Sequence, residues 1–356
     1  MIKPTERSAA TEVQHGRQLL SIRDLSVHYN TAQGVSKAVD GVSLDVTTGE
    51  ILGIAGESGC GKSTLANAIL RLTRPPGYIA GGAIQFFPRE GEPFDLLTVD
   101  EAKLRQIRWR HLAYVPQGSM NSLNPVMRIE QQFLDTMEEH RAYKGPEARE
   151  RIPYLLEQVN LKPHVTRMYP HELSGGMKQR VIIAMAIALD PDLVIADEPT
   201  TALDVNVQRM IIQTLSELRD RMGMSLIIVS HDMAVHAELV DRVAVMYAGE
   251  IVEVGDVRRV FKQPQHPYTQ SLIQAIPRVG GPRLRLEGIV GNAPNPTDWP
   301  AGCRFHPRCK YATAFCQREH PLLFDVSSKG DGAKPHLVAC HLYSHPEQMG
   351  GNRDPQ

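Results

Sequence analysis

Apolar residues in the first two thirds of the chain gather in short runs of strand length, separated by longer stretches with helical spacing. Four of these runs are continuous enough to be buried strands: Ile51–Ala55, His111–Val115, Leu193–Ala196 and Leu226–Val229. Continuous apolar runs are typical of parallel strands that are covered on both faces. The pattern therefore predicts an α/β protein built on a parallel sheet.

Other patterns predict elements around this sheet. Leu19 to Tyr29 and Ala38 to Val46 alternate between apolar and polar residues, which predicts an antiparallel pair ahead of the first buried strand. Arg242 to Val254 predicts a hairpin with its turn at 248–250. Few strand signals occur between about 118 and 190, where we expect a helical subdomain. One later helix is predicted to end at Gly223 and to show one apolar face, formed by Val207, Met210, Ile211, Leu215, Leu218 and Met222.

The composition of the chain and its apolar periodicity change near Gly255. Prolines become frequent, the periodicity fades, and four of the five cysteines occur between 303 and 340. We expect residues 18–255 to form the α/β domain and residues 256–343 to form a separate, loop-rich C-terminal domain. Residues 1–17 are expected to be a disordered tail, and residues 344–356 a polar tail.

The segment after the first buried strand matches the pattern Gly-x-x-x-x-Gly-Lys-Ser/Thr, and a helical pattern with Leu65, Ile69 and Leu72 on one face follows it. In this strand–loop–helix context, backbone N–H groups and the helix N-terminus cradle phosphates. A glycine-rich turn without a ligand would not need this context. Lys62 is expected to reach the β- and γ-phosphates of a nucleotide, and Ser63 to offer its hydroxyl to Mg²⁺. The residues predicted to bind nucleotide here are Gly56, Glu57, Ser58, Gly59, Cys60, Gly61, Lys62, Ser63 and Thr64.

Composition limits the classes of partner that this protein can have. The formal charge of −1 over 356 residues argues against a general nucleic-acid-binding protein, which normally carries a basic excess. The first eighteen residues show no apolar secretory segment, and the longest apolar run, Val181–Leu189, is shorter than the roughly 20 residues that span a bilayer. Work at a membrane would therefore require partner subunits.

Polar residues follow the other predicted strands. Asp197 is expected to hold Mg²⁺, and Glu198 to polarise the attacking water as a general base. Gln117 and His231 follow two further strands and are able to reach the γ-phosphate region. Because the carboxyl ends of parallel strands meet at one edge of a sheet, these residues should converge on one site. Alone, each would be read as an ordinary turn or structural residue, but their order along successive strands makes coincidence implausible.

A second candidate anion site opens the helix that carries Val181–Leu189. It begins with Leu173-Ser174-Gly175-Gly176, where Ser174 and the two glycines leave backbone N–H groups bare at a helix N-terminus.

Together these motifs resemble the ATP-binding subunits of ABC transporters, over about residues 19–255. The resemblance rests on the phosphate loop, Gln117, Leu173–Gly176, Asp197-Glu198, Ala202-Leu203-Asp204 and His231. It implies that two such subunits enclose two ATP molecules and that Ser174, Gly175 and Gly176 contact the ATP of the partner. It also implies nucleotide contacts for Asp204, a Mg²⁺ contact for Gln117, and adenine stacking for Tyr29, whose alternative role is that of an ordinary strand-end tyrosine. Catalysis would depend on Lys62, Gln117, Glu198 and His231.

Other classes of this superfamily fit less well. A DNA-repair ATPase of this superfamily would carry a long coiled coil between the two phosphate-binding motifs, and a ribosome-acting one would carry two tandem cassettes. An exporter would usually fuse its own membrane spans. This sequence shows none of these features.

The C-terminal segment resembles that of oligopeptide and dipeptide importers, through His266-Pro267-Tyr268-Thr269 and a later cysteine frame. Four thiolates suit either a Zn²⁺ site or a [4Fe–4S] cluster, and the spacing matches neither pattern closely. The resemblance implies a [4Fe–4S] cluster, with Zn²⁺ or free thiols as alternatives. The frame consists of Cys303, Cys309, Cys316 and Cys340, whereas Cys60 is interpreted as a small filler in the phosphate loop.

The importer resemblance implies a peripheral ATPase on the cytoplasmic face of the cell membrane. It would work with two membrane-spanning permease subunits and with a second ATPase subunit, either a related one or another copy of itself. An extracellular solute-binding protein would take part indirectly, and nucleic acid would not. Oligopeptides or dipeptides are the expected solutes, and oligosaccharides or nickel the alternatives. One departure from the family follows Gln117, where Gly118-Ser119 replaces the usual Asp-Pro or similar pair.

Overall fold

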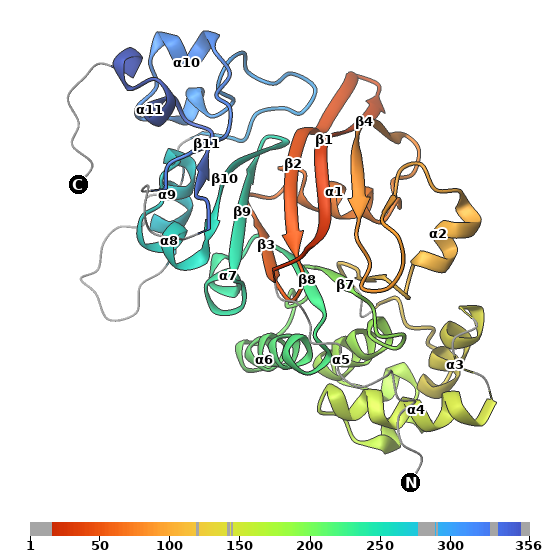
Figure 1. Cartoon of the computed structure of the whole chain (residues 1–356). Coiled ribbons are helices and arrows are strands. Elements are labelled where there is room, and N and C mark those ends of the chain that lie inside the picture. Colours follow the sequence, from red (N-terminus) through yellow and green to blue (C-terminus); the bar gives the residue numbers. More distant parts are fainter. Residues whose placement is uncertain are drawn as a thin grey trace.

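The computed structural model describes residues 16–118, 121–140, 143, 145–276, 289, 291–327 and 334–349. The expected tails therefore lie mostly outside the described residues, as do Ser119 and the prolines at 277 and 282. The described part contains two sheets, of four strands and eight strands (Figure 1).

The four-stranded sheet is antiparallel and has the order β2-β1-β4-β5. The predicted pair is confirmed, because Ser21 of β1 lies opposite Asp45 of β2, and Leu20 on the other edge lies opposite Phe86 of β4. The strands are β1 (Gln18–Thr31), β2 (Gly34–Thr47), β4 (Gly77–Phe86) and β5 (Phe94–Asp95).

The eight-stranded sheet has the order β11-β12-β10-β9-β3-β8-β7-β6. Its part from β9 to β6 is parallel, and all four strands predicted to be buried and parallel are confirmed there. Side chains of β3 alternate between two cores: Ile51 faces one, and Leu52 and Ile54 face the other. The strands are β3 (Ile51–Ala55), β6 (Leu112–Val115), β7 (Leu193–Asp197), β8 (Ser225–Ser230), β9 (Arg242–Tyr247), β10 (Glu250–Asp256), β11 (Phe324–Asp325) and β12 (Leu337–Val338).

Helices cover the large sheet and fill the region between β6 and β7. Figure 1 shows α3, α4 and α5 together at one end of the molecule, which agrees with the helical region expected at about 118–190. The helices of the first 240 residues are α1 (Lys62–Ile69), α2 (Glu101–Ile107), α3 (Ile129–Glu139), α4 (Gly145–Gln158), α5 (Gly175–Ala186), α6 (Val205–Met222) and α7 (Met233–Leu239), with 3-10 turns η2 (Pro163–Arg167) and η3 (Pro170–Glu172).

Two details of the predicted helices are wrong. Leu72 does not extend the face of α1, because α1 ends at Ile69 and Arg71 has a left-handed backbone with φ of 50°. Met210 of α6 is 41% exposed, and Ile212 is buried in its place. The end of α6 at Gly223 agrees with the prediction, since this residue takes the left-handed conformation with φ of 62°.

The C-terminal segment packs directly onto the α/β core. Strand β12 extends the large sheet by pairing with β10, where Val338 lies opposite Glu253. Tyr268 and Phe305 belong to the same buried cluster as Tyr247 of β9, so the expected boundary at 255 does not separate two cores. The elements here are α8 (Val257–Lys262), α9 (Pro267–Gln274), η4 (His306–Arg308), α10 (Ala314–Arg318), α11 (His341–Ser344) and η5 (Pro346–Met349).

Across the described residues, no helix has both the length and the apolar character that crossing a membrane requires.

Candidate active site

The phosphate loop joins β3 to α1, and its glycines are required by close contacts. Gly56 has φ of 149°, and a Cβ placed there would lie 2.2 Å from the carbonyl oxygen of Met246. Gly61 has φ of 109°, and its Cβ would lie 2.2 Å from the carbonyl oxygen of Ala38. Larger residues at either position would force the backbone of the loop away from β9 or β2.

Lys62 lies under this loop. Its buried Nζ donates to the carbonyl oxygens of Gly56, at 2.8 Å, and Glu57, at 2.9 Å. The Sγ of Cys60 lies 3.7 Å from the same nitrogen. Burial raises the pKa of the Cys60 thiol.

Asp197 ends β7 beside the start of α1. It is 1% exposed, and its Oδ2 accepts a hydrogen bond of 3.4 Å from the hydroxyl of Tyr114. Burial raises its pKa, while the nearby hydroxyl of Ser63 acts in the opposite direction. Among the described residues, its buried Oδ1 has no hydrogen-bond partner. A carboxylate oxygen without a partner beside a serine hydroxyl fits the Mg²⁺ site expected from the sequence.

Glu198, the next residue, has its carboxylate held on both oxygens. Its Oε1 accepts from the backbone N–H of His231 at 3.0 Å and lies 2.7 Å from the ring Nδ1 of that residue. Its Oε2 accepts from the hydroxyls of Thr201, at 3.0 Å, and Ser230, at 3.4 Å. Burial acts to raise the pKa of Glu198, but the bonds from His231 and Thr201 outweigh it, so the pKa lies below the ordinary value.

The predicted residues at the strand ends lie along one edge of the sheet. Strands β3, β8, β7 and β6 are parallel neighbours, so the phosphate loop, His231, Asp197 and Gln117 all follow carboxyl ends. His231 contacts Glu198 directly, although its side chain is 56% exposed. Gln117 lies exposed in the turn after β6.

The second candidate anion site forms a capped helix start. The Oγ of Ser174 accepts from the backbone N–H of Met177 at 3.3 Å, and Gly175 and Gly176 open α5. Gly176 is buried against α6, because a Cβ there would lie 2.5 Å from Cγ1 of Val207. Figure 1 shows α5 in the helical region, apart from α1.

Two other predicted residues have local structural roles. Asp204 caps α6, where its Oδ1 accepts from the N–H groups of Asn206 and Val207 at 3.1 and 3.0 Å. Tyr29 lies half-buried near the end of β1 and packs against Gly77, where a Cβ would lie 2.6 Å from its ring.

Sequence reasoning missed several residues that support the site. Thr201, Ser230 and Tyr114 hold the two carboxylates, and Thr201 lies between the motifs Asp197-Glu198 and Ala202-Leu203-Asp204. Tyr268 and Arg308 reach the phosphate loop from the C-terminal segment: the Tyr268 hydroxyl accepts from the N–H of Glu57 at 2.8 Å, and the Arg308 guanidinium pairs with the Glu57 carboxylate. Tyr268 lies in the segment His266–Thr269 that resembles importers, and Arg308 directly precedes Cys309 of the cysteine frame, but sequence analysis assigned neither residue a role.

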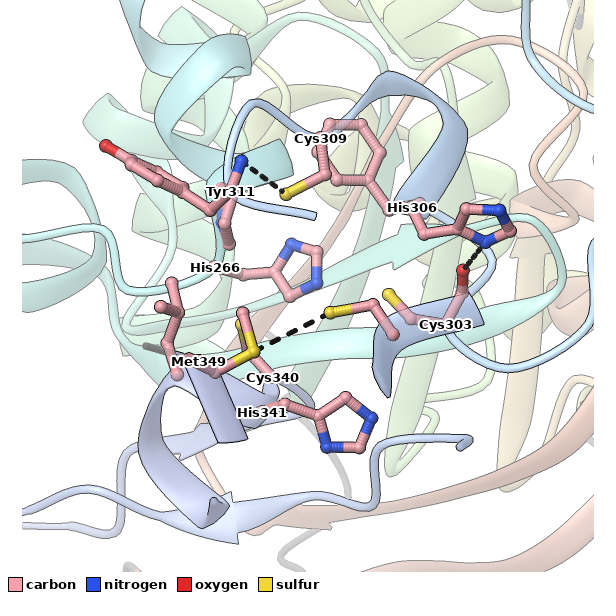
Figure 2. A pocket seen from close by; sticks show the side chains of 12 residues that line it. His266, Cys303, His306, Cys309, Tyr311, Cys340, His341 and Met349 are labelled. Carbon is pink, nitrogen blue, oxygen red and sulfur yellow. Dashed lines mark hydrogen bonds between the residues drawn. The ribbon is translucent and has the colours of Figure 1, made fainter. Parts of the chain in front are cut away.

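The four C-terminal cysteines line one small pocket, which also contains His266, His341 and Met349 (Figure 2). All four are free thiols. Burial raises the pKa of both Cys303 and Cys340 to about 12, and the charges of neighbouring cysteines act in the same direction. The cavity between them is about 10 Å³, close to the room for one water molecule. Within the described residues, no three His, Cys, Asp or Glu side chains are arranged closely enough to hold a metal ion.

Comparison with known proteins adds independent findings. Residues 39–201 match the family described as ABC transporter, and residues 252–316 match the family described as oligopeptide/dipeptide transporter, C-terminal region. The dipeptide transport ATP-binding protein DppD of Caldanaerobacter subterraneus is 43% identical, over 91% of this chain and 97% of its own length. The protein of the same name from Escherichia coli is 41% identical, over 89% and 96%. A solved dimeric bacterial ABC transporter cassette, 28% identical, covers 67% of this chain and 99% of its own chain with a TM-score of 0.59.

Proposed function

We propose a function for this chain from one premise: it belongs to the ATP-binding proteins of ABC transporters, in the oligopeptide/dipeptide group. The chain is an ATPase that energises the import of peptides. The observation that carries the catalytic part is the carboxylate of Glu198, which is buried, charged and held by His231 at the end of β7.

In this mechanism, backbone N–H groups of the phosphate loop bind the triphosphate, and Lys62 exchanges its loop carbonyl partners for phosphate oxygens. Glu198 accepts a proton from the attacking water as the water oxygen bonds to the γ-phosphorus and the bond to the β,γ-bridging oxygen breaks. Asp197, Ser63 and Gln117 would hold Mg²⁺, which would supply positive charge beside the phosphates. His231 orients the Glu198 carboxylate.

A second ATPase subunit completes the site. Ser174, Gly175 and Gly176 of one subunit contact the ATP bound by the other, and Asp204 lies near this interface. The position of α5 apart from α1 within one chain supports this arrangement. Tyr29 stacks on the adenine. The partner is a related ATPase or another copy of this chain.

The transport assembly is inferred from the group to which the chain belongs. Two membrane-spanning permease subunits hold the ATPase pair at the cytoplasmic face of the cell membrane, and an extracellular binding protein delivers the solute. The match of residues 252–316 to the oligopeptide/dipeptide C-terminal family supports a peptide as solute. Oligosaccharides and nickel are the alternatives that the experiment must separate.

The test uses the complete transporter in proteoliposomes. The solute-binding protein whose gene neighbours the gene of this chain is added to it. We expect ATP hydrolysis and uptake to rise when the binding protein carries a dipeptide or oligopeptide, and Lys62→Ala to abolish both. Stimulation by an oligosaccharide or by Ni²⁺ instead would reassign the solute and retain the ATPase. Full hydrolysis by the Lys62→Ala transporter would contradict the proposed nucleotide site.

We also propose that Cys303, Cys309, Cys316 and Cys340 bind a metal centre. Their convergence on one pocket supports this, and a metal would keep as thiolates the thiols whose pKa burial now raises. The family resemblance favours a [4Fe–4S] cluster. The cavity of about 10 Å³ is too small for a cluster, and because no three of these side chains lie closely enough to hold a metal ion, the described thiols would have to move for either occupant.

Metal analysis separates these two occupants. Protein purified without oxygen is assayed for iron, acid-labile sulfide and zinc, together with its visible absorbance. Four irons and four sulfides per chain, lost in Cys303→Ser and retained in Cys60→Ser, would identify the cluster, and one zinc with the same mutational pattern would identify the simpler site. Protein that binds neither metal would contradict the proposed centre.

A further inference from the structure

Glu57, the second residue of the phosphate loop, is held through each of its polar groups. Its backbone N–H donates to the hydroxyl of Tyr268 at 2.8 Å, and its carbonyl oxygen accepts from Nζ of Lys62 at 2.9 Å. Its carboxylate accepts two bonds from Arg308, from Nη1 at 2.8 Å and from Nη2 at 3.0 Å. Two of these three partners come from the C-terminal segment.

Arg308 has little freedom to move. It ends the 3-10 turn η4, and its side chain is only 6% exposed. Its guanidinium carbon lies 5.8 Å from the centre of the Tyr247 ring, and Phe305, three residues earlier, packs against both Tyr247 and Tyr268 with ring centres 5.2 and 5.5 Å apart. A two-point bond from a guanidinium fixed in this way sets both the place and the orientation of a carboxylate.

We propose that Arg308 and Tyr268 are positioning residues of the ATP site, which act on the phosphate loop through Glu57. This inference rests on the proposed binding of ATP by that loop. Tyr268 fixes the Gly56–Glu57 peptide by accepting from its N–H, and the carbonyl oxygen of the same peptide, on Gly56, accepts from Nζ of Lys62 at 2.8 Å. Arg308 compensates the Glu57 charge, which would otherwise repel a triphosphate bound by the same loop.

The test compares Arg308→Gln with a matched control, Arg304→Gln. Arg304 lies in the same C-terminal segment, its side chain is 10% exposed, and it pairs with Asp40 and Glu250, which are outside the phosphate loop. Both variants lose a buried ion pair between the C-terminal segment and the core. Only one of them loses a contact with the loop.

Equilibrium binding of Mg·ATP is measured on the purified full-length subunit, and KM and kcat on the assembled transporter. For Arg308→Gln we expect a rise of about tenfold in both Kd and KM, since hydrogen bonds to charged groups are lost, with kcat at saturating ATP changed by less than about twofold. Arg304→Gln is expected to lower the melting temperature while leaving Kd unchanged. Tyr268→Phe, which keeps the ring packing, is expected to raise Kd.

Two further variants separate charge from geometry. Arg308→Lys keeps the positive charge but cannot make the two-point bond of a guanidinium, so it should recover only part of the affinity for ATP. Adding Glu57→Gln to Arg308→Gln removes the uncompensated carboxylate and should lower Kd again, a non-additive result. Unchanged ATP affinity in both Arg308→Gln and Tyr268→Phe would overturn the inference. Failure of the wild-type subunit to bind ATP at all would instead overturn the proposed function.

Discussion

His231 contacts Oε1 of Glu198 with two of its nitrogens, the backbone N–H at 3.0 Å and the ring Nδ1 at 2.7 Å. The two residues directly follow neighbouring parallel strands, β8 and β7. Because the backbone bond survives any side-chain substitution at position 231, the orientation of Glu198 and its proton affinity can be altered separately. Glu198 itself has a left-handed backbone with φ of 50°, a conformation that recurs at functional sites.

Replacing Glu198 by glutamine should remove the general base and leave the nucleotide site in place. We expect turnover to fall by about 10²–10⁴-fold. ATP should still bind, and ATP-dependent pairing of subunits should persist because the closed state is no longer hydrolysed. Single-turnover hydrolysis measures the loss of turnover, and size-exclusion chromatography with Mg·ATP measures the pairing of subunits. Near-normal turnover would show that another group takes the proton from water.

The ring of His231 should determine the pH below which the rate of ATP hydrolysis falls. It helps to keep the folded-state pKa of Glu198 below its ordinary value, so the carboxylate stays charged until the pH falls below that range. His231→Ala removes this contribution and should raise the pKa of Glu198. The acid limb of kcat should then move to higher pH. A pH profile at saturating ATP measures the shift, with the exposed His164→Ala as control, and an unmoved limb would contradict this link.

The strands and the phosphate loop could be predicted from local sequence because each depends on neighbours along the chain. A buried strand such as Ile51–Ala55 is continuously apolar, and the turn at Gly56 and Gly61 admits only glycine. Contacts between residues that are distant in the sequence could not be predicted in this way. The pairing of Glu57 with Arg308 joins residues 251 positions apart, and no periodicity or local motif records such a contact.

The C-terminal segment shows the same limit. Its prolines and cysteines predicted irregular structure. Its strands contain two residues each, but α8 and α9 are regular helices. Its attachment to the core depends on Tyr268 and Phe305, two aromatic residues in segments without clear periodicity, and on the backbone pairing of β12 with β10. Sequence patterns report which residues are apolar, not which distant surface they cover.

Gly176 should be intolerant of even one added methyl group. A Cβ there would lie 2.5 Å from Cγ1 of Val207, a β-branched side chain that has little freedom on α6. We expect Gly176→Ala to destabilise the protein by about 1–3 kcal/mol and to disturb the Ser174 cap. Val207→Ala removes the clash, so the double variant should be more stable than Gly176→Ala alone. Urea unfolding of the four proteins measures this, and additive losses would contradict it.

Removing the proposed metal centre should weaken ATP binding through Arg308. Cys303 and Cys309 bracket the turn that carries Arg308, and both line the cysteine pocket. Anaerobic removal of the metal should loosen this turn and raise the Kd for Mg·ATP by about threefold or more. In Arg308→Gln the same treatment should have little further effect, because the connection is already lost. Equal affinities of loaded and metal-free wild-type protein would show that the centre and the ATP site are independent.

His236 should make the fold sensitive to mild acid. The residue is fully buried, its Nε2 lies 3.1 Å from the carbonyl oxygen of Ser230, and burial lowers its pKa to about 4 from the ordinary 6.5. Asp232 and Glu198 act to raise the pKa of His236, and Lys62 acts with burial to lower it. Between these two pH values the unfolded chain binds a proton that the native state does not. The free energy of unfolding should therefore fall as the pH drops, by about 1.4 kcal/mol per pH unit from this residue.

Urea unfolding from pH 7 to pH 4 tests this, with His236→Gln expected to show a slope smaller by about one proton. If that variant does not fold, hydrogen exchange at the imidazole C2 position, followed by mass spectrometry, reports the pKa of His236 in the wild-type protein. A native value near 6.5 would show that protonation of this ring is tolerated, and would contradict the prediction. A value near 4 would mean that protonation of His236 destabilises the fold at the edge of the ATP site. There His236 packs against Gly53 of β3, the strand that directly precedes the phosphate loop.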